Sequence, residues 1–141
     1  MELPDLLARL HWLGNASFRL DGPPTIYFDP VGTSRNELPQ ADIILISHSH
    51  GDNYSPTLLK RISKPDTVIV TSQVVATLLS QDGVPGQVRV LRPAERTAVG
   101  AVEIEATEAY KYQQILSPEG IREPGIHRDT AWKAHLLRRG Y

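Results

Sequence analysis

The chain has 141 residues, of which 40% are hydrophobic and 22% are charged, and its 15 basic and 16 acidic side chains leave a formal net charge of −1. This length predicts a single domain over residues 1–141, with the assignment of residues 111–141 left open. The balanced charge argues against nucleic acid as a partner. Because the sequence has no cysteine, disulfides and thiolate metal sites are excluded, and any metal must bind to His, Asp or Glu.

The sequence shows neither a membrane span nor a signal peptide. No apolar run approaches the roughly 20 residues that cross a bilayer. Residues 1–5 are acidic and lack the basic and then apolar order of a signal peptide. We therefore expect a cytoplasmic protein that does not associate with membranes.

The apolar pattern predicts a strand-rich first part, followed by strands that alternate with helices. Ser55 and Pro56 predict the start of one helix, and a second is predicted at residues 72–81. Residues 111–129 have no clear period, and residues 131–139 fit a strand or a short helix. Strands are expected at residues 8–13, 16–20, 25–28, 42–47, 67–70, 88–91, 97–99 and 102–106.

Residues 42–47 form an almost continuous run of apolar, mostly β-branched side chains. Such a run is typical of a strand that is buried on both faces, in a sheet covered by helices. Together with the strand–helix order that follows, it predicts an α/β fold. In this fold, helices pack on one face of a mixed β-sheet, as in half of an α/β sandwich.

A metal-binding motif directly follows this predicted strand, with His48, His50 and Asp52 at every second position. An extended backbone turns residues two apart to the same side, so both imidazoles and the carboxylate can reach one point. This ligand set suits zinc, iron or manganese. The end of a buried strand is also where α/β folds place their sites. The alternative is a polar loop with two solvated histidines.

Three segments in order resemble the metallo-β-lactamase fold superfamily, within its lactonase-like "metal-dependent hydrolase" branch. They are residues 12–18, residues 27–30 and residues 41–52, and the resemblance extends over about residues 8–110. It implies an αββα sandwich with metals at one edge of paired sheets. It also implies hydrolysis of an ester, lactone, amide or phosphodiester by a metal-activated water.

The resemblance also implies roles for individual residues. His48 and His50 would bind the first metal, while Asp52 would bind the second metal and steer the attacking hydroxide as the catalytic residue. Asp29 would accept a hydrogen bond from the second nitrogen of a ligand imidazole and so anchor it, or else be a turn residue before Pro30. His127 would be a further metal ligand, or else an exposed loop histidine.

The chain departs from the family in two respects. The family pattern is H-x-H-x-D-H, and Asn53 stands where the last histidine would bind the second metal. Because an amide is a weaker ligand, we expect Asn53 beside the site and a single or partly occupied ion, zinc or another divalent metal such as Mn or Fe. The family's later G-D-T motif and last histidine are not recognised, which predicts a chain truncated to the N-terminal half.

Two functions remain open at this point. The chain is either a metal-dependent hydrolase of a small-molecule substrate or a degenerate, non-catalytic member that acts as a binding or structural subunit. A half-fold with helices on one face would leave its other face apolar. We therefore expect a homodimer in which each chain completes the fold of the other.

Overall fold

The computed structural model describes residues 3–32, 37–49, 51, 53–113, 116–117, 120–121 and 125–138. The helices are α1 (Leu3–Arg9), α2 (Pro56–Ile62) and α3 (Gln73–Asp82). The strands are β1 (Leu10–Gly14), β2 (Ser17–Leu20), β3 (Ile26–Phe28), β4 (Ile43–Ile46), β5 (Val68–Thr71), β6 (Gln87–Val90), β7 (Arg96–Val99), β8 (Val102–Gln113), β9 (Leu116–Ser117), β10 (Gly120–Ile121) and β11 (Gly125–Arg138).

A six-stranded sheet with the order β1-β2-β3-β4-β5-β6 forms the centre of the fold. Its first three strands are antiparallel, and β3 to β6 run parallel. Parallel neighbours need a crossover connection, which α2 supplies between β4 and β5 and α3 between β5 and β6. The prediction of an α/β fold with a mixed sheet is thus confirmed.

Strand β4 is buried on both faces, as its apolar run predicts. Ile44 and Ile46 join the core beneath α2 and α3, which includes Leu59 and Leu79 from the two helices. The alternate side chains, such as Ile43, join a second core on the other face of the sheet. This alternation follows from the period of two along a strand.

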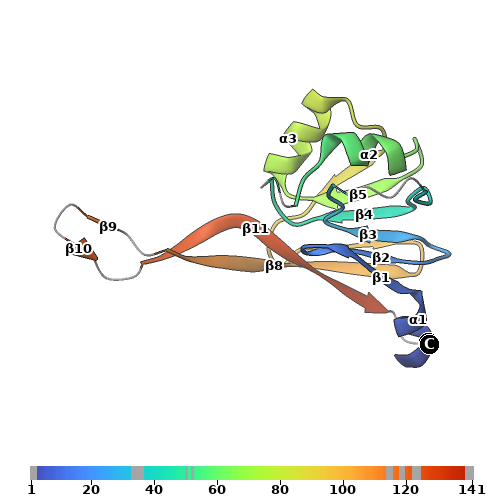
Figure 1. Ribbon diagram of the computed structural model, residues 1–141, viewed down its shortest axis with the longest axis horizontal. Coiled ribbons are helices and arrows are strands. Elements are labelled where there is room, and N and C mark those ends of the chain that lie inside the picture. Colours follow the sequence, from blue (N-terminus) through green and yellow to red (C-terminus); the bar gives the residue numbers. More distant parts are fainter. Residues whose placement is uncertain are drawn as a thin grey trace.

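A second sheet with the order β11-β8-β7 covers the face opposite the helices. Ile104 and Ala106 of β8 are fully buried in the second core, together with Ile43 and Val70 of the six-stranded sheet. In Figure 1, α2 and α3 lie above the strands of the large sheet, whereas the hairpin of β8 and β11 is seen at the level of β1 and β2 and extends to the left. The expectation of an uncovered apolar face was therefore wrong. It no longer supports the prediction of a homodimer.

The two ends of the chain differ from the sequence prediction. Residues 3–9 form a helix, α1, with Asp5 in its first turn and Arg9 in its last, which suits the helix dipole, and no residue of α1 is buried. Near the other end, β8 and β11 pair as a long antiparallel hairpin in which Gly125 opposes Gln113. Backbone pairing forms this hairpin where the side-chain pattern has no period.

Among the described residues, the helices are too short or too polar to cross a bilayer.

We expect Ile104→Ala to lower the free energy of unfolding by about 2–5 kcal/mol, because its loss leaves a cavity between the two sheets. Urea denaturation followed by circular dichroism measures this change. Val88→Ala is the control, since Val88 is 40% exposed on β6 and its truncation should cost less than about 1 kcal/mol. Equal effects of the two substitutions would show that β8 does not cover the sheet.

Candidate metal-binding site

The candidate site lies where two neighbouring parallel strands end. Strand β3 pairs with β4 so that Phe28 opposes Leu45. Asp29 follows β3 directly, and Ser47 and His48 follow β4. Because parallel strands end at the same edge of a sheet, residues 18 positions apart in the sequence become neighbours there.

The backbone of Asp29 is fixed at an unusual conformation. Its φ of 43° lies in the left-handed region, which few residues other than glycine adopt. The Asp29 N–H donates to the carbonyl of Leu45 at 2.8 Å, and the Asp29 carbonyl accepts a hydrogen bond from the Ser17 hydroxyl. Such conformations persist where the surroundings determine them, and they cluster at functional sites.

The Asp29 carboxylate reaches His48 through Ser47. Asp29 Oδ1 accepts from the Ser47 N–H at 2.7 Å, and Asp29 Oδ2 accepts from the Ser47 hydroxyl at 2.8 Å. Ser47 Oγ lies 2.8 Å from His48 Nδ1. We call this Asp29–Ser47–His48 chain the relay. A ligand imidazole needs such a partner at its second nitrogen, which fixes the orientation of the ring.

Asn53 contacts the relay at the Asp29 carboxylate. Its side chain is 4% exposed and hydrogen-bonds to the Asp29 carboxylate. Burial raises the pKa of Asp29 above its ordinary value, against the opposing effect of hydrogen bonds from Ser47 and Asn53 and of the nearby His48. A buried carboxylate that accepts several hydrogen bonds keeps a fixed position. It is therefore suited to orient the His48 imidazole through Ser47.

The structure brings Asp29, His48 and Asn53 together, but it does not describe the rest of the predicted site. His50 and Asp52 lie outside the described residues. The prediction of a loop around His127 was wrong, because its backbone lies in β11, opposite Lys111 of β8. The side chain of His127 is not described either. Within the described part of the chain, no three His, Asp or Glu side chains gather as a metal site.

Ser47 is the site residue that the sequence analysis missed. Its signal was weak, since one serine at the end of a strand has many roles. It lies directly before the first histidine of the motif, at the end of the strand that pairs with β3, and its hydroxyl is within hydrogen-bond distance of both Asp29 and His48.

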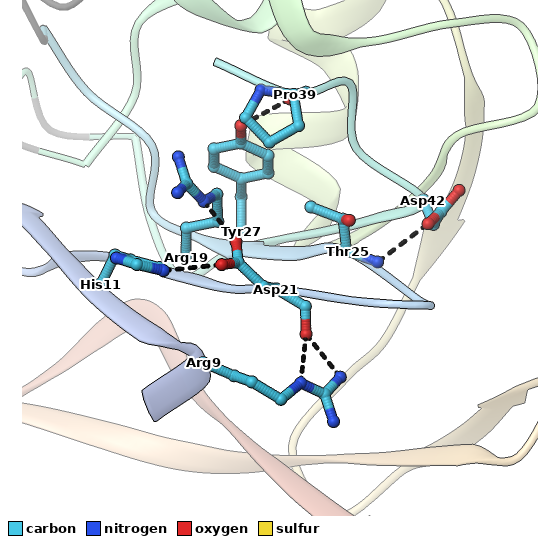
Figure 2. Close-up of polar contacts among 8 residues, drawn as sticks. All are labelled: Arg9, His11, Arg19, Asp21, Thr25, Tyr27, Pro39 and Asp42. Carbon is cyan, nitrogen blue, oxygen red and sulfur yellow. Dashed lines mark hydrogen bonds and ion pairs between the residues drawn. The ribbon is translucent and has the colours of Figure 1, made fainter. Parts of the chain in front are cut away.

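A second polar cluster surrounds Asp21, in the turn between β2 and β3. It lies near the start of β3, whereas Asp29 follows the end of that strand. Figure 2 shows Asp21 accepting hydrogen bonds from His11 Nε2 at 2.6 Å and from Arg19 Nε at 2.8 Å. The Arg9 guanidinium also donates to the main-chain oxygen of Asp21 (Figure 2). These contacts attach the end of α1 to the β2–β3 turn, so His11 belongs to a structural cluster rather than to the candidate site.

The loop that carries the motif returns to the core at Tyr54. Its hydroxyl donates to Asp82 Oδ2 at 2.6 Å, at the last residue of α3, and its ring packs against the core beneath the helices. Burial and the Asp82 carboxylate raise the pKa of Tyr54 well above 10.0. Tyr54 therefore connects the motif loop to α3.

Comparisons with known proteins agree with the predicted fold. A model of the beta-lactamase superfamily domain matches residues 9–132. The chain is 37% identical over 79 residues to the UPF0173 metal-dependent hydrolase of Methanoculleus marisnigri, across 56% of this chain and 33% of that protein.

Solved structures share the fold of this chain. A crystal structure from Parabacteroides distasonis that carries the name metal-dependent hydrolase matches with a TM-score of 0.60 and 30% identity, over 72% of this chain and 45% of that one. The isothiocyanate hydrolase from Delia radicum gut bacteria shares the fold, with a TM-score of 0.57 and 17% identity over 92% of this chain and 57% of that one. The chain thus spans a third to little more than half of these relatives.

We expect Tyr54→Phe to lower the free energy of unfolding by about 1 kcal/mol at neutral pH, through loss of the hydrogen bond to Asp82. The raised pKa means that the folded state holds the phenol proton more tightly than the unfolded chain. Its stabilising contribution is complete below pH 10.0 and is lost as the pH rises from there through the folded pKa. The difference between wild type and variant should therefore shrink above pH 10.0.

Denaturant titrations at neutral and alkaline pH measure this difference. Asp82→Asn is the matched variant, because the amide oxygen can still accept the hydrogen bond but carries no charge to raise the pKa of Tyr54. A difference between wild type and Tyr54→Phe that stays constant with pH would contradict the prediction.

Proposed function

Because the chain belongs to the beta-lactamase superfamily, we propose that it is a metal-dependent hydrolase that cleaves a small-molecule ester, lactone or phosphodiester. The observation that supports the proposal most is the relay, which ties His48 to a buried carboxylate at the carboxyl end of β4. A solvated loop histidine needs no such partner. The names of the relatives, which are metal-dependent hydrolases, support the same class of reaction.

The donor set fits a divalent metal. His48 has the supporting hydrogen bond that ligand imidazoles use, and His50 and Asp52 follow it at the spacing of the family motif. We propose that His48, His50 and Asp52 hold the ion, with His127 as a further candidate. A bound divalent ion would act as a Lewis acid and lower the pKa of water to about 7.

The side chains of the protein divide the remaining work. Asp29, Ser47 and Asn53 keep the His48 ring in place, and the Asp52 carboxylate orients the attacking water and accepts its proton. General base catalysis of this kind contributes a factor on the order of 10²–10⁴ to the rate. The proposed substrate class is taken from the family and from the proposed metal site. The choice of one ester, lactone or phosphodiester would depend on the side chains around the substrate.

We propose one ion per chain, with zinc as the first choice and manganese or iron as alternatives. The support is Asn53, which replaces an imidazole of the family pattern and whose side chain is buried against Asp29. An amide that already bonds to a carboxylate is a poor substitute for a second-metal histidine.

The second candidate function is a non-catalytic subunit that binds a partner. The inward-facing Asn53 favours it, because this residue supports the fold instead of a second ion. We keep the homodimer within this proposal. Its support is now a different surface, since Leu3, Leu7 and Trp12 of α1 and β1 are 66%, 59% and 63% exposed. A cytoplasmic location is proposed with both functions.

Protein purified without chelator is expected to contain at most one tightly bound divalent ion per chain, and His48→Ala should lose it. Elemental analysis by mass spectrometry measures the ratio of metal to protein. His11→Ala is the matched control, because His11 bonds to Asp21 and should leave the metal content unchanged. Two tightly bound ions per chain would contradict the role given to Asn53.

Any hydrolysis of ester, lactone or phosphodiester substrates is expected to fall by about 100-fold in Asp52→Ala and to stop when a chelator removes the metal. Initial rates across a panel of chromogenic substrates test this. Asp66→Ala, at an exposed turn before β5, serves as the control. Hydrolysis that survives both the substitution and the chelator would refute the proposed reaction. A metal-loaded protein inactive on every substrate would favour the non-catalytic subunit.

A further inference from the structure

We propose that Ser47 is a positioning residue that selects the tautomer of His48, keeping the ring proton on Nδ1 and the lone pair on Nε2. The proposal rests on the proposed function only for its consequence, which is that Nε2 becomes the ligand atom. The tautomer itself is a property of the metal-free chain, so it can be measured whether or not a metal binds.

The number of available protons determines the direction of the relay. A serine hydroxyl has one hydrogen to donate and lone pairs that accept. Ser47 Oγ has two partners at 2.8 Å, Asp29 Oδ2 and His48 Nδ1. A carboxylate can only accept, so the hydroxyl hydrogen points to Asp29. The contact with His48 then requires a hydrogen on Nδ1, and the neutral ring has none on Nε2.

Asp29 is held too firmly for this direction to reverse. Its backbone is fixed at both ends by Leu45 and Ser17, and its carboxylate accepts from the Ser47 main chain as well as from the hydroxyl. The Asn53 side chain bonds to the same carboxylate. A rigid acceptor therefore fixes the Ser47 hydroxyl, and the hydroxyl in turn fixes the ring of His48.

Without the hydroxyl, Ser47 no longer supplies the acceptor that holds the ring proton on Nδ1, so the proton of a neutral imidazole can also lie on Nε2. A proton on Nε2 occupies the lone pair that a metal would need and must be removed before binding. Loss of a partner that orients a ligand histidine typically weakens metal affinity by about 10–100-fold. Ser47→Ala is therefore expected to weaken metal binding within this range, although it removes no metal ligand.

The central experiment is nitrogen-15 NMR of the imidazole rings in the metal-free protein, at a pH roughly two units above the ordinary histidine pKa of about 6.5. Comparison with His48→Gln assigns the His48 signals. Wild type should show His48 protonated on Nδ1, and Ser47→Ala should show a mixture or the Nε2-protonated form. Ser47→Thr keeps a hydroxyl at this position and should therefore show the wild-type pattern. Ser49→Ala, one residue beyond His48, is the control and should change nothing.

Asp29→Asn gives the sharpest test, because it should invert the relay. In wild type, the two carboxylate oxygens accept separately from the Ser47 N–H and the Ser47 hydroxyl. In the amide, one of these positions becomes an NH₂ group, and it cannot face the N–H donor. The NH₂ therefore faces the hydroxyl and donates to it, so the hydroxyl hydrogen turns to His48 Nδ1. His48 should then carry its proton on Nε2.

The outcomes separate this proposal from the proposed function. If wild-type His48 is protonated on Nε2, or if Ser47→Ala leaves an Nδ1-protonated ring, the relay is refuted even when metal binds. If the tautomers change as expected but no metal binds at His48, the relay stands and the metal site fails. Circular dichroism shows whether the variants fold. Should Ser47→Ala not fold, the wild-type and Asp29→Asn spectra still decide the question.

Discussion

The parallel pairing of β3 with β4 is the constraint on which the candidate site depends. It brings the residue after β3 next to the residues after β4, so that Asp29 can bond to both the main chain and the hydroxyl of Ser47. The strands themselves are held by burial on both faces, between the core beneath α2 and α3 and the core that β8 completes. A change in the register of this pair by one residue would exchange the two faces and separate the site.

The elements that the sequence predicted well are those with strong local signals. The run at residues 42–47 gave β4, and the caps of the helices also agree with the sequence. The Ser55 side chain accepts from the Leu58 N–H at the start of α2, and Gly83 ends α3 with a φ of 68°. Ser72 stands at the start of α3, but its side chain makes no capping hydrogen bond. For α3, the sequence could predict that Ser72 is the N-cap residue. It could not predict whether the side chain forms the capping hydrogen bond, because this depends on the rotamer.

The parts that the sequence did not predict depend on contacts between distant segments. The second sheet covers the large sheet because Ile104 and Ala106 happen to face it, and no local pattern shows which face a strand will meet. The hairpin of β8 and β11 extends through parts of residues 111–129, where the sequence has no clear period. In the candidate site, the motif predicted His48 and the resemblance predicted Asp29. Ser47 required the geometry of both strands, because one partner of its hydroxyl follows β3 and the other follows β4.

The relay and its supports come from a short stretch of the chain, between Ser17 and Asn53. The entropy lost when a loop closes grows with loop length, and local contacts form early in folding. Strands β2 to β4 can therefore assemble the base of the site before the second sheet arrives from residues 96–138. In that order of events, the Asp29 carboxylate acquires its hydrogen bonds while it is still close to water. When burial then raises the pKa of the Asp29 carboxyl group, the hydrogen bonds from Ser47 and Asn53 are already in place to oppose this effect.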